Sequence, residues 1–184
     1  APALCNRIDR NTGGIVIVTK NAESLRILNE AIKNRELSKF YLCLVKGVPS
    51  PREATLTHYH MKNEAENKAI VLDKPRSGAR TMVTHYRVLQ SNGRFSLLEV
   101  ELETGRTHQI RAQMAHIGCP LVGDGKYSVN AADRKKGFSY QALYSYKLRF
   151  DFREEHSLSY LKGNTFQVED VWFAKNGIPD ALAE

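Results

Sequence analysis

The chain has 184 residues, a length typical of one domain with a sizeable hydrophobic core. Lys and Arg number 27 against 20 Asp and Glu, which gives a formal net charge of +7. The surplus is concentrated early, since nine basic residues face four acidic ones in the stretch that ends at Arg52. Such a surplus favours a polyanionic partner, most often nucleic acid, although many basic proteins bind none. No apolar run is long enough to cross a bilayer, so no membrane partner is expected.

The three cysteines, Cys5, Cys43 and Cys119, occur at no spacing typical of metal ligands. Their odd number argues against a disulfide framework. Cys43 lies in an apolar run that is typical of a core, and Cys119 lies between a glycine and a proline, which predicts a buried turn. We therefore expect free thiols, no metal and a reducing, cytoplasmic compartment.

The first half of the chain predicts strands around one amphipathic helix. Residues 15–19 form a short β-branched run after two glycines and predict a strand. Asn21 is the predicted N-cap of a helix that reaches about Arg35. The buried face of this helix is predicted to carry Leu25, Leu28, Ala31 and Ile32. Further strands are predicted over 39–46, 54–60 and 68–72.

The second half contains a hairpin and a second helix. Asn92-Gly93, a strong hairpin signal, separates predicted strands over 80–91 and 94–103. A helix after Thr107 is predicted to end at Gly118. Residues 126–140 are polar and predict a loop with a basic cluster, Arg134-Lys135-Lys136, which either contacts RNA or is a solvated surface. Late strands are predicted over 143–152 and 165–172. Strands joined by turns, with few crossover helices, predict a single α+β domain with a mixed, mostly antiparallel central sheet, flanked by helices and loops.

The segment 104–111 (Thr-Gly-Arg-Thr-His-Gln-Ile-Arg) is the most informative part of the chain. Gly105 is expected to turn the chain out of the preceding strand, and Thr107 is the predicted N-cap of the helix that follows. The free backbone N–H groups and positive dipole of the first turn, beside Arg106 and His108, predict an anion site. The alternative is a solvated helix start that is polar without binding anything.

Two further segments carry candidate chemistry. Asp9 lies between Arg7 and Arg10 on a loop before a strand, and nearby positive charge favours its ionised form. An ionised, positioned carboxylate can act as a nucleophile or general base; the alternative is an Asx-type turn in which Asp9 caps its own backbone. Tyr41 shares one face of its strand with Cys43, and its ring either stacks on a base or packs in the core.

These three segments, in this order, resemble the signature motifs of the RluA-type pseudouridine synthases. Residues 7–14 are similar to the family's HRLD-x-x-T-S-G motif, and residues 39–47 resemble its K-x-Y-x-x-x-V-x-G strand. Residues 104–111, with Gly118, Pro120 and Gly123-Asp124, resemble its T-G-R-T-H-Q-[IL]-R…G-x-P…G-D block. The resemblance also runs through 84–89 and 141–143, and so covers nearly the whole chain.

The resemblance implies isomerisation of uridine to pseudouridine in structured RNA, on a flipped-out nucleotide, without cofactor or metal. Asp9 would start cleavage of the glycosidic bond, by attack at C1′ or by removal of the 2′ proton; neither is preferred here. Arg111 would pair with Asp9, and Tyr41 would stack on the target base and assist proton movement. The expected RNA-binding residues are Arg7, Arg10, Arg106, His108 and Ile110, of which Ile110 would supply apolar lining under the base.

The sequence also departs from the family pattern. Asn6 stands where the family usually has histidine, and Gly13 where it usually has serine. Family members have further strands before the aspartate motif, so the chain resembles an amino-terminally truncated catalytic domain without an accessory RNA-binding domain. Ribosomal RNA is the first expected substrate and transfer RNA the second, and no obligate protein partner is expected. A catalytically silent RNA-binding module and a uracil-releasing glycosylase remain as alternatives.

Overall fold

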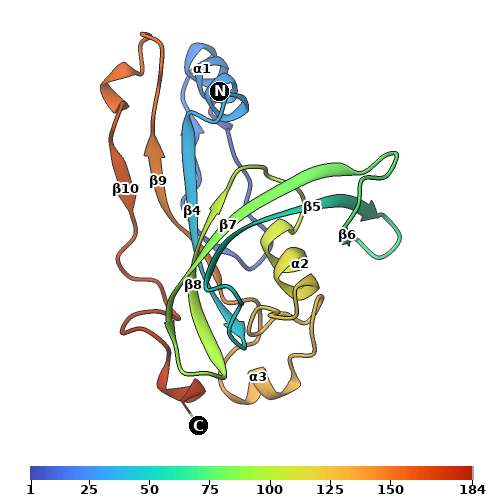
Figure 1. Cartoon of the computed structure of the whole chain (residues 1–184). Coiled ribbons are helices and arrows are strands. Elements are labelled where there is room, and N and C mark those ends of the chain that lie inside the picture. The colour runs from blue at the N-terminus through green and yellow to red at the C-terminus, as the bar shows by residue number, and fades with distance from the viewer. Residues whose placement is uncertain (184) are drawn as a thin grey trace.

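The computed structural model describes residues 1–183, which form one large curved sheet with three helices placed around it (Figure 1). The sheet has eight strands in the order β10-β9-β4-β8-β7-β5-β6, with β2 added beside β9. The strands are β1 (Ala3–Leu4), β2 (Gly13–Gly14), β3 (Val18–Thr19), β4 (Leu37–Lys46), β5 (Glu53–Asn63), β6 (Lys68–Leu72), β7 (Arg80–Ser91), β8 (Phe95–Leu102), β9 (Leu143–Phe150) and β10 (Thr165–Gln167). The helices are α1 (Ala22–Lys33), α2 (Gln109–His116) and α3 (Ala131–Lys135), with two 3₁₀ turns at Ser159–Leu161 and Asp180–Leu182.

The strand pairings confirm the predicted α+β fold with a mixed, mostly antiparallel sheet. Every neighbouring pair along the main path is antiparallel, whereas β2 runs parallel to β9. A separate two-stranded pairing joins β1 to β3. Strands β5, β6 and β7 bend away from the rest of the sheet as an arm, and α2 lies beside this arm (Figure 1).

The core is divided by the two faces of β4. Tyr41, Cys43 and Val45 pack on one face with Ile110 and Met114 of α2. The opposite face packs against a different part of the chain, and its cluster contains Phe40, Leu42, Leu44, Val171 and Phe173. The strict alternation along β4 was predicted from the sequence and is confirmed, since successive side chains of a strand point to opposite faces.

Local sequence signals predict several elements correctly. The Asn21 side chain accepts a 2.8 Å hydrogen bond from the Ser24 N–H, which caps the start of α1. Asn92-Gly93 joins β7 to β8 with Gly93 at φ +89°, a backbone angle that suits glycine. The buried face of α1 differs in part from the prediction, because Ile27 is buried whereas Leu25 and Ile32 are only half-buried.

Three predicted segments differ from the structure. Of the expected strand 15–19, only residues 18–19 form a strand, β3. The residues before it change their hydrogen-bond partners: the Ile15 N–H donates to Ser145 O, whereas the Ile17 N–H donates to the Asn6 side chain. The expected strand 165–172 ends at Gln167, after which the chain turns and buries Val171 and Phe173. The expected loop 126–140 contains α3, which includes Arg134 and Lys135 of the basic cluster. Figure 1 shows α3 at the end of the molecule opposite α1.

Gly14 joins the segment that carries Asp9 to the sheet, and we predict that Gly14→Ala is strongly destabilising. At φ +124° an added Cβ would lie 2.2 Å from Ser145 O, so β2 could not stay paired with β9. Gly118→Ala is the matched control: it has φ +88° but no atom within 4 Å of the added Cβ, so only backbone strain of about 1 kcal/mol is expected. Urea unfolding should show a clearly larger loss for Gly14→Ala, and equal losses would contradict the close packing at β2.

Candidate active site

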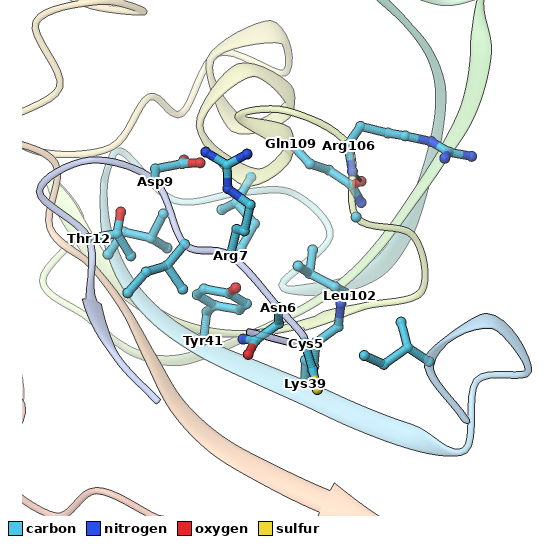
Figure 2. A pocket seen from close by; sticks show the side chains of 15 residues that line it. Cys5, Asn6, Arg7, Asp9, Thr12, Lys39, Tyr41, Leu102, Arg106 and Gln109 are labelled. Carbon is cyan, nitrogen blue, oxygen red and sulfur yellow. Dashed lines mark hydrogen bonds between the residues drawn. The ribbon is translucent and has the colours of Figure 1, made fainter. Parts of the chain in front are cut away.

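A cavity of about 320 Å³ opens between the amino-terminal segment, β4 and the start of α2 (Figure 2). Five residues predicted to act at the site line this cavity: Arg7, Asp9, Tyr41, Arg106 and Ile110. They come from segments that are as much as 103 positions apart, so the cavity depends on the sheet to bring them together. Arg111 reaches Asp9 from outside the lining, whereas Arg10 and His108 take part in other contacts described below.

Arg111 is the centre of the polar contacts beside the cavity, and its main partner is Asp124. Its Nε donates to Asp124 Oδ2 at 2.7 Å and its second terminal nitrogen donates to Asp124 Oδ1 at 3.1 Å, a bidentate pair. Both side chains are buried, Asp124 completely. Burial alone would lower the pKa of the Arg111 guanidinium, but the hydrogen bonds and charge of Asp124 outweigh it and raise that pKa. The pair is therefore ionised, and the guanidinium is fixed in one orientation.

The remaining terminal nitrogen of Arg111 faces Asp9, with Nη1 3.8 Å from Asp9 Oδ2. The two residues lie 102 positions apart, and their predicted proximity is confirmed. The contact is a loose ion pair and not a short hydrogen bond, because the guanidinium is held by Asp124. One side of Asp9 thus faces a fixed positive charge while its carboxylate stays beside the cavity.

The loop around Asp9 is held through its backbone. Thr12 N–H donates to Asp9 O at 3.0 Å, and Asn11 adopts a left-handed conformation with φ 67°. The buried Gln141 amide donates to Arg10 O at 2.6 Å and to Thr12 Oγ1 at 3.1 Å. Within residues 1–183 the Asp9 carboxylate accepts no hydrogen bond from its own turn. The alternative in which Asp9 only caps its own backbone is therefore wrong, and its side chain is available for another partner.

Tyr41 forms one wall of the cavity and also belongs to the core. Its side chain is buried among the residues of β4 and α2, and its ring borders the space next to Asp9 (Figure 2). Burial, together with the negative charge of Asp9, raises the pKa of Tyr41 to about 12. The phenol is consequently neutral at physiological pH and presents an aromatic surface without charge.

The turn before α2 differs from the prediction in two respects. The N-cap is His108, with φ 55°, and not Thr107, and the left-handed backbone lies at His108 and not at Gly105. The reason is Gln109: its buried side chain accepts from Thr104 Oγ1 and from Arg106 N–H, and it donates to β7. Since Gln109 satisfies the Arg106 N–H, this group is not free for an anion as the sequence predicted.

His108 also differs from a cationic anion-binding residue. Its Nδ1 lies 2.7 Å from the Tyr127 hydroxyl, and burial lowers the pKa of its imidazole below the usual value. The ring is therefore neutral at pH 7. Arg106 lines the cavity and donates from Nε to Thr81 O at 2.9 Å. In Figure 2 the Arg7 guanidinium lies on the same side as the Asp9 carboxylate, whereas the Arg106 side chain extends away from it.

Sequence reasoning missed several residues that build the site. In the sequence Asp124 stands out only as part of a motif, and nothing in its local sequence connects it to Arg111. Tyr127 places its ring 5.3 Å from the Arg111 guanidinium carbon and accepts a hydrogen bond from Ala69 N–H. The Asp124 carboxylate further accepts from the backbone N–H groups of Lys126 and Tyr127. These contacts are long-range or depend on side-chain rotamers, so only the three-dimensional arrangement reveals them.

One cluster away from the cavity has the composition of a metal site. Ligand atoms of His58, Asp73 and His116 lie within 4.8 Å of one another. The Gln113 amide, however, donates to His58 Nδ1 at 2.8 Å, so the proton of the neutral ring lies on Nε2. A metal bound at Nε2 would need that proton moved to Nδ1, against the Gln113 donor, so the cluster fits a metal poorly. No helix within residues 1–183 has the length and apolarity needed to span a membrane.

Comparison with known proteins decides the family. The family described as RNA pseudouridylate synthase matches residues 1–116, which include Asp9, Tyr41 and Arg111. The chain belongs to the RNA pseudouridylate synthase family. An uncharacterized RNA pseudouridine synthase of Chloroflexus aurantiacus is 38% identical over 128 residues, which are 68% of this chain and 39% of that protein. The ribosomal large subunit pseudouridine synthase D of Borreliella burgdorferi is 32% identical over 150 residues, which are 82% of this chain and 45% of that protein.

Solved structures of the family share the fold. Human RNA pseudouridylate synthase domain containing 4 superposes with a TM-score of 0.70 at 21% identity, over 91% of this chain and 70% of that one. Human RNA pseudouridylate synthase domain containing 1 gives 0.69 at 22% identity, over 98% and 83%. The chain spans less than half the length of the two curated relatives named above.

We predict that Asp124→Asn destabilises the fold far more than the loss of a surface ion pair. Removing one partner of a buried, bidentate pair leaves a buried charge unpaired and costs about 3–5 kcal/mol. Asp151→Asn is the control, because its 3.0 Å contact with Arg149 is half-exposed and such pairs contribute about 0–1 kcal/mol. Chemical denaturation measures both free energies of unfolding. Similar losses for the two variants would show that the Arg111–Asp124 pair is not the anchor of the site.

Proposed function

We propose that this protein isomerises uridine to pseudouridine within structured RNA, with Asp9 as the reacting carboxylate. The observation that carries the proposal is the arrangement around Asp9. A carboxylate without a partner in its own turn lies 3.8 Å from a fixed guanidinium and borders a cavity with an aromatic wall. Membership of the RNA pseudouridylate synthase family supports this reading of the geometry.

The reaction exchanges one bond for another. The N1–C1′ bond of the uridine breaks, the uracil turns, a C5–C1′ bond forms, and the C5 proton is released while N1 gains a proton. Asp9 would begin the exchange either by attack at C1′ or by removal of the 2′ proton. In both cases Asp9 would react as a carboxylate, with the fixed guanidinium of Arg111 3.8 Å from its Oδ2. Because the target base is stacked inside RNA, the nucleotide must first be flipped into the cavity.

The other residues of the cavity would hold the flipped nucleotide. Tyr41 is a neutral aromatic surface at physiological pH and suits stacking on the uracil ring. Ile110 adds apolar lining, and apolar walls exclude water that would hydrolyse the intermediate. Arg7 and Arg106 would contact phosphates or fill the gap that the flipped nucleotide leaves. Arg10 is exposed and would contact RNA outside the cavity, whereas the half-buried, neutral His108 is better suited to positioning Tyr127.

Ribosomal RNA is our first choice of substrate and transfer RNA the second. A relative that is 32% identical carries the name of a ribosomal large subunit pseudouridine synthase, which supports this order. The three cysteines of the present protein are free, which suits a reducing compartment, so we place this protein in the cytoplasm.

Tritium release from [5-³H]uridine-labelled RNA tests the proposal against its two alternatives. A pseudouridine synthase releases tritium, leaves the RNA chain intact and yields no free uracil. A uracil-releasing glycosylase would yield free uracil, and a silent RNA-binding module would yield neither product. Unmodified large-subunit ribosomal RNA is the first substrate to use, with transfer RNA transcripts as the second.

We predict that Asp9→Asn abolishes turnover while folding and RNA affinity remain close to those of the unaltered protein. Asparagine keeps the shape of the side chain, but it is neither an effective nucleophile nor a base. Asp170→Asn is the matched control, since Asp170 is exposed and forms a surface ion pair with Lys175. Single-turnover tritium release and RNA binding by filter retention measure the two effects. Substantial residual activity of Asp9→Asn would overturn the assignment of Asp9.

A further inference from the structure

Lys39 lies in the wall of the candidate active site, and among the described residues it has no counter-ion. It lies on β4 two residues before Tyr41, on the same face of the strand and about 6.7 Å along it. Burial lowers the pKa of its ammonium group, and no carboxylate offsets this effect. Within residues 1–183 no Asp or Glu oxygen lies within the 4.0 Å range of an ion pair with Lys39 Nζ. A half-buried ammonium that lacks a protein partner is costly unless a ligand supplies the negative charge.

Lys39 stands between the site cavity and a second hollow. This hollow has a volume of about 500 Å³, large enough for a small ligand, and it adjoins the site cavity. Both spaces share the same dividing wall, which consists of Ile32, Lys39, Leu102, Gly105 and Arg106. Gly105 has no side chain, and an added Cβ would lie 3.6 Å from Lys39 Nζ. The ammonium group therefore lies directly over the turn that separates the two spaces.

Arg106 is a second uncompensated cation in the same wall. Its Nε donates to the Thr81 carbonyl, and within the described residues it has no carboxylate partner. The acidic residues of the second hollow do not provide one. Glu103 pairs with Arg35 and accepts a hydrogen bond from His85 Nε2 at 2.7 Å. Glu101 precedes Leu102 on β8, so its side chain leaves the strand on the face opposite to that of Leu102. Lys39 and Arg106 thus both belong to the shared wall, and within the described residues neither pairs with a carboxylate.

We propose that Lys39, together with Arg106, binds the phosphodiester that joins the target nucleotide to its neighbour, and that this neighbour lies in the second hollow. The inference rests on the proposed function, because it places the target nucleotide in the site cavity. A nucleotide stacked on Tyr41 must be connected to the rest of the RNA by phosphodiesters, and the shared wall is where the two spaces meet. Lys39 would then set the direction in which the RNA chain leaves the active site.

Binding of heptauridylate, a single-stranded RNA of seven uridines, tests this assignment. Affinity is measured by fluorescence anisotropy between 50 and 300 mM salt, for the unaltered protein, for Lys39→Gln and for Lys162→Gln, an exposed lysine outside both spaces. A single phosphate contact on single-stranded nucleic acid contributes about 0.7 to the slope of log affinity against log salt, which corresponds to about fivefold in affinity at 0.1 M salt. We expect Lys39→Gln to lose both amounts, Lys162→Gln to lose neither, and Lys39→Arg to restore the slope.

A neutral backbone separates a phosphate contact from a structural role. Heptauridylate in which every phosphodiester is replaced by a methylphosphonate has the same bases without charge. Lys39→Gln should bind this ligand as well as the unaltered protein does. An equal loss on both backbones, or no loss on either, would overturn the proposal.

Tritium release keeps this inference distinct from the proposed function. If the unaltered protein isomerises uridine but Lys39→Gln binds heptauridylate normally, only the role of Lys39 is wrong. If the Lys39 effect depends on phosphate charge but tritium is never released, the proposed function is wrong and the phosphate site remains.

Discussion

The ion pair between Arg111 and Asp124 is the constraint on which the site depends. A single guanidinium makes two hydrogen bonds to a completely buried carboxylate and turns its remaining edge toward Asp9. Buried ion pairs are weak evidence of added stability, because desolvation opposes the attraction. Their geometric consequence is different: two parallel hydrogen bonds leave the guanidinium little freedom to rotate. The position of the positive charge beside Asp9 is thus decided by Asp124, which does not line the cavity.

Buried amides extend this arrangement into the sheet. The Gln109 side chain uses all four of its hydrogen-bonding positions, two toward the turn before α2 and two toward β7. Thr84 Oγ1, which accepts from Gln109, donates to Gln113 at 2.6 Å. Because buried polar groups without partners are costly, this network allows α2 only one position on the sheet. The eight residues of α2 therefore hold Arg111 in place even though the helix is too short to be stable by itself.

Signals that act within a few residues were readable from the sequence. The cap at Asn21, the hairpin at Asn92-Gly93 and the alternation along β4 each depend on neighbours in the chain, and each agrees with the structure. The proximity of Asp9 and Arg111 was also predicted, but from resemblance to a family and not from local physics. The roles of Tyr41 and the RNA-binding arginines remain predictions.

The features that the sequence did not reveal depend on distant partners. The run 15–17 has strong β propensity, yet it is divided between Ser145 on β9 and the Asn6 side chain. His108 replaces Thr107 as the cap because the Gln109 side chain folds back on the preceding turn. Asp124 lies 13 positions after Arg111, beyond any helical or strand repeat that connects two side chains. Lys39 begins the segment that resembles the K-x-Y-x-x-x-V-x-G strand, but the sequence suggests no role for it, and its position between two cavities does.

The single-turnover rate of Arg111→Lys measures the central claim most directly. Lysine keeps the positive charge and can still pair with Asp124, but one ammonium group cannot hold Asp124 through two parallel bonds and also face Asp9. If the fixed guanidinium is what prepares Asp9, the variant should fold and bind RNA, and its rate of tritium release should fall by about a hundredfold or more, a loss of roughly 2.7 kcal/mol in transition-state stabilisation. A rate within about threefold of the unaltered protein, roughly 0.6 kcal/mol on the same scale, would show that a positive charge alone is sufficient and would contradict this account.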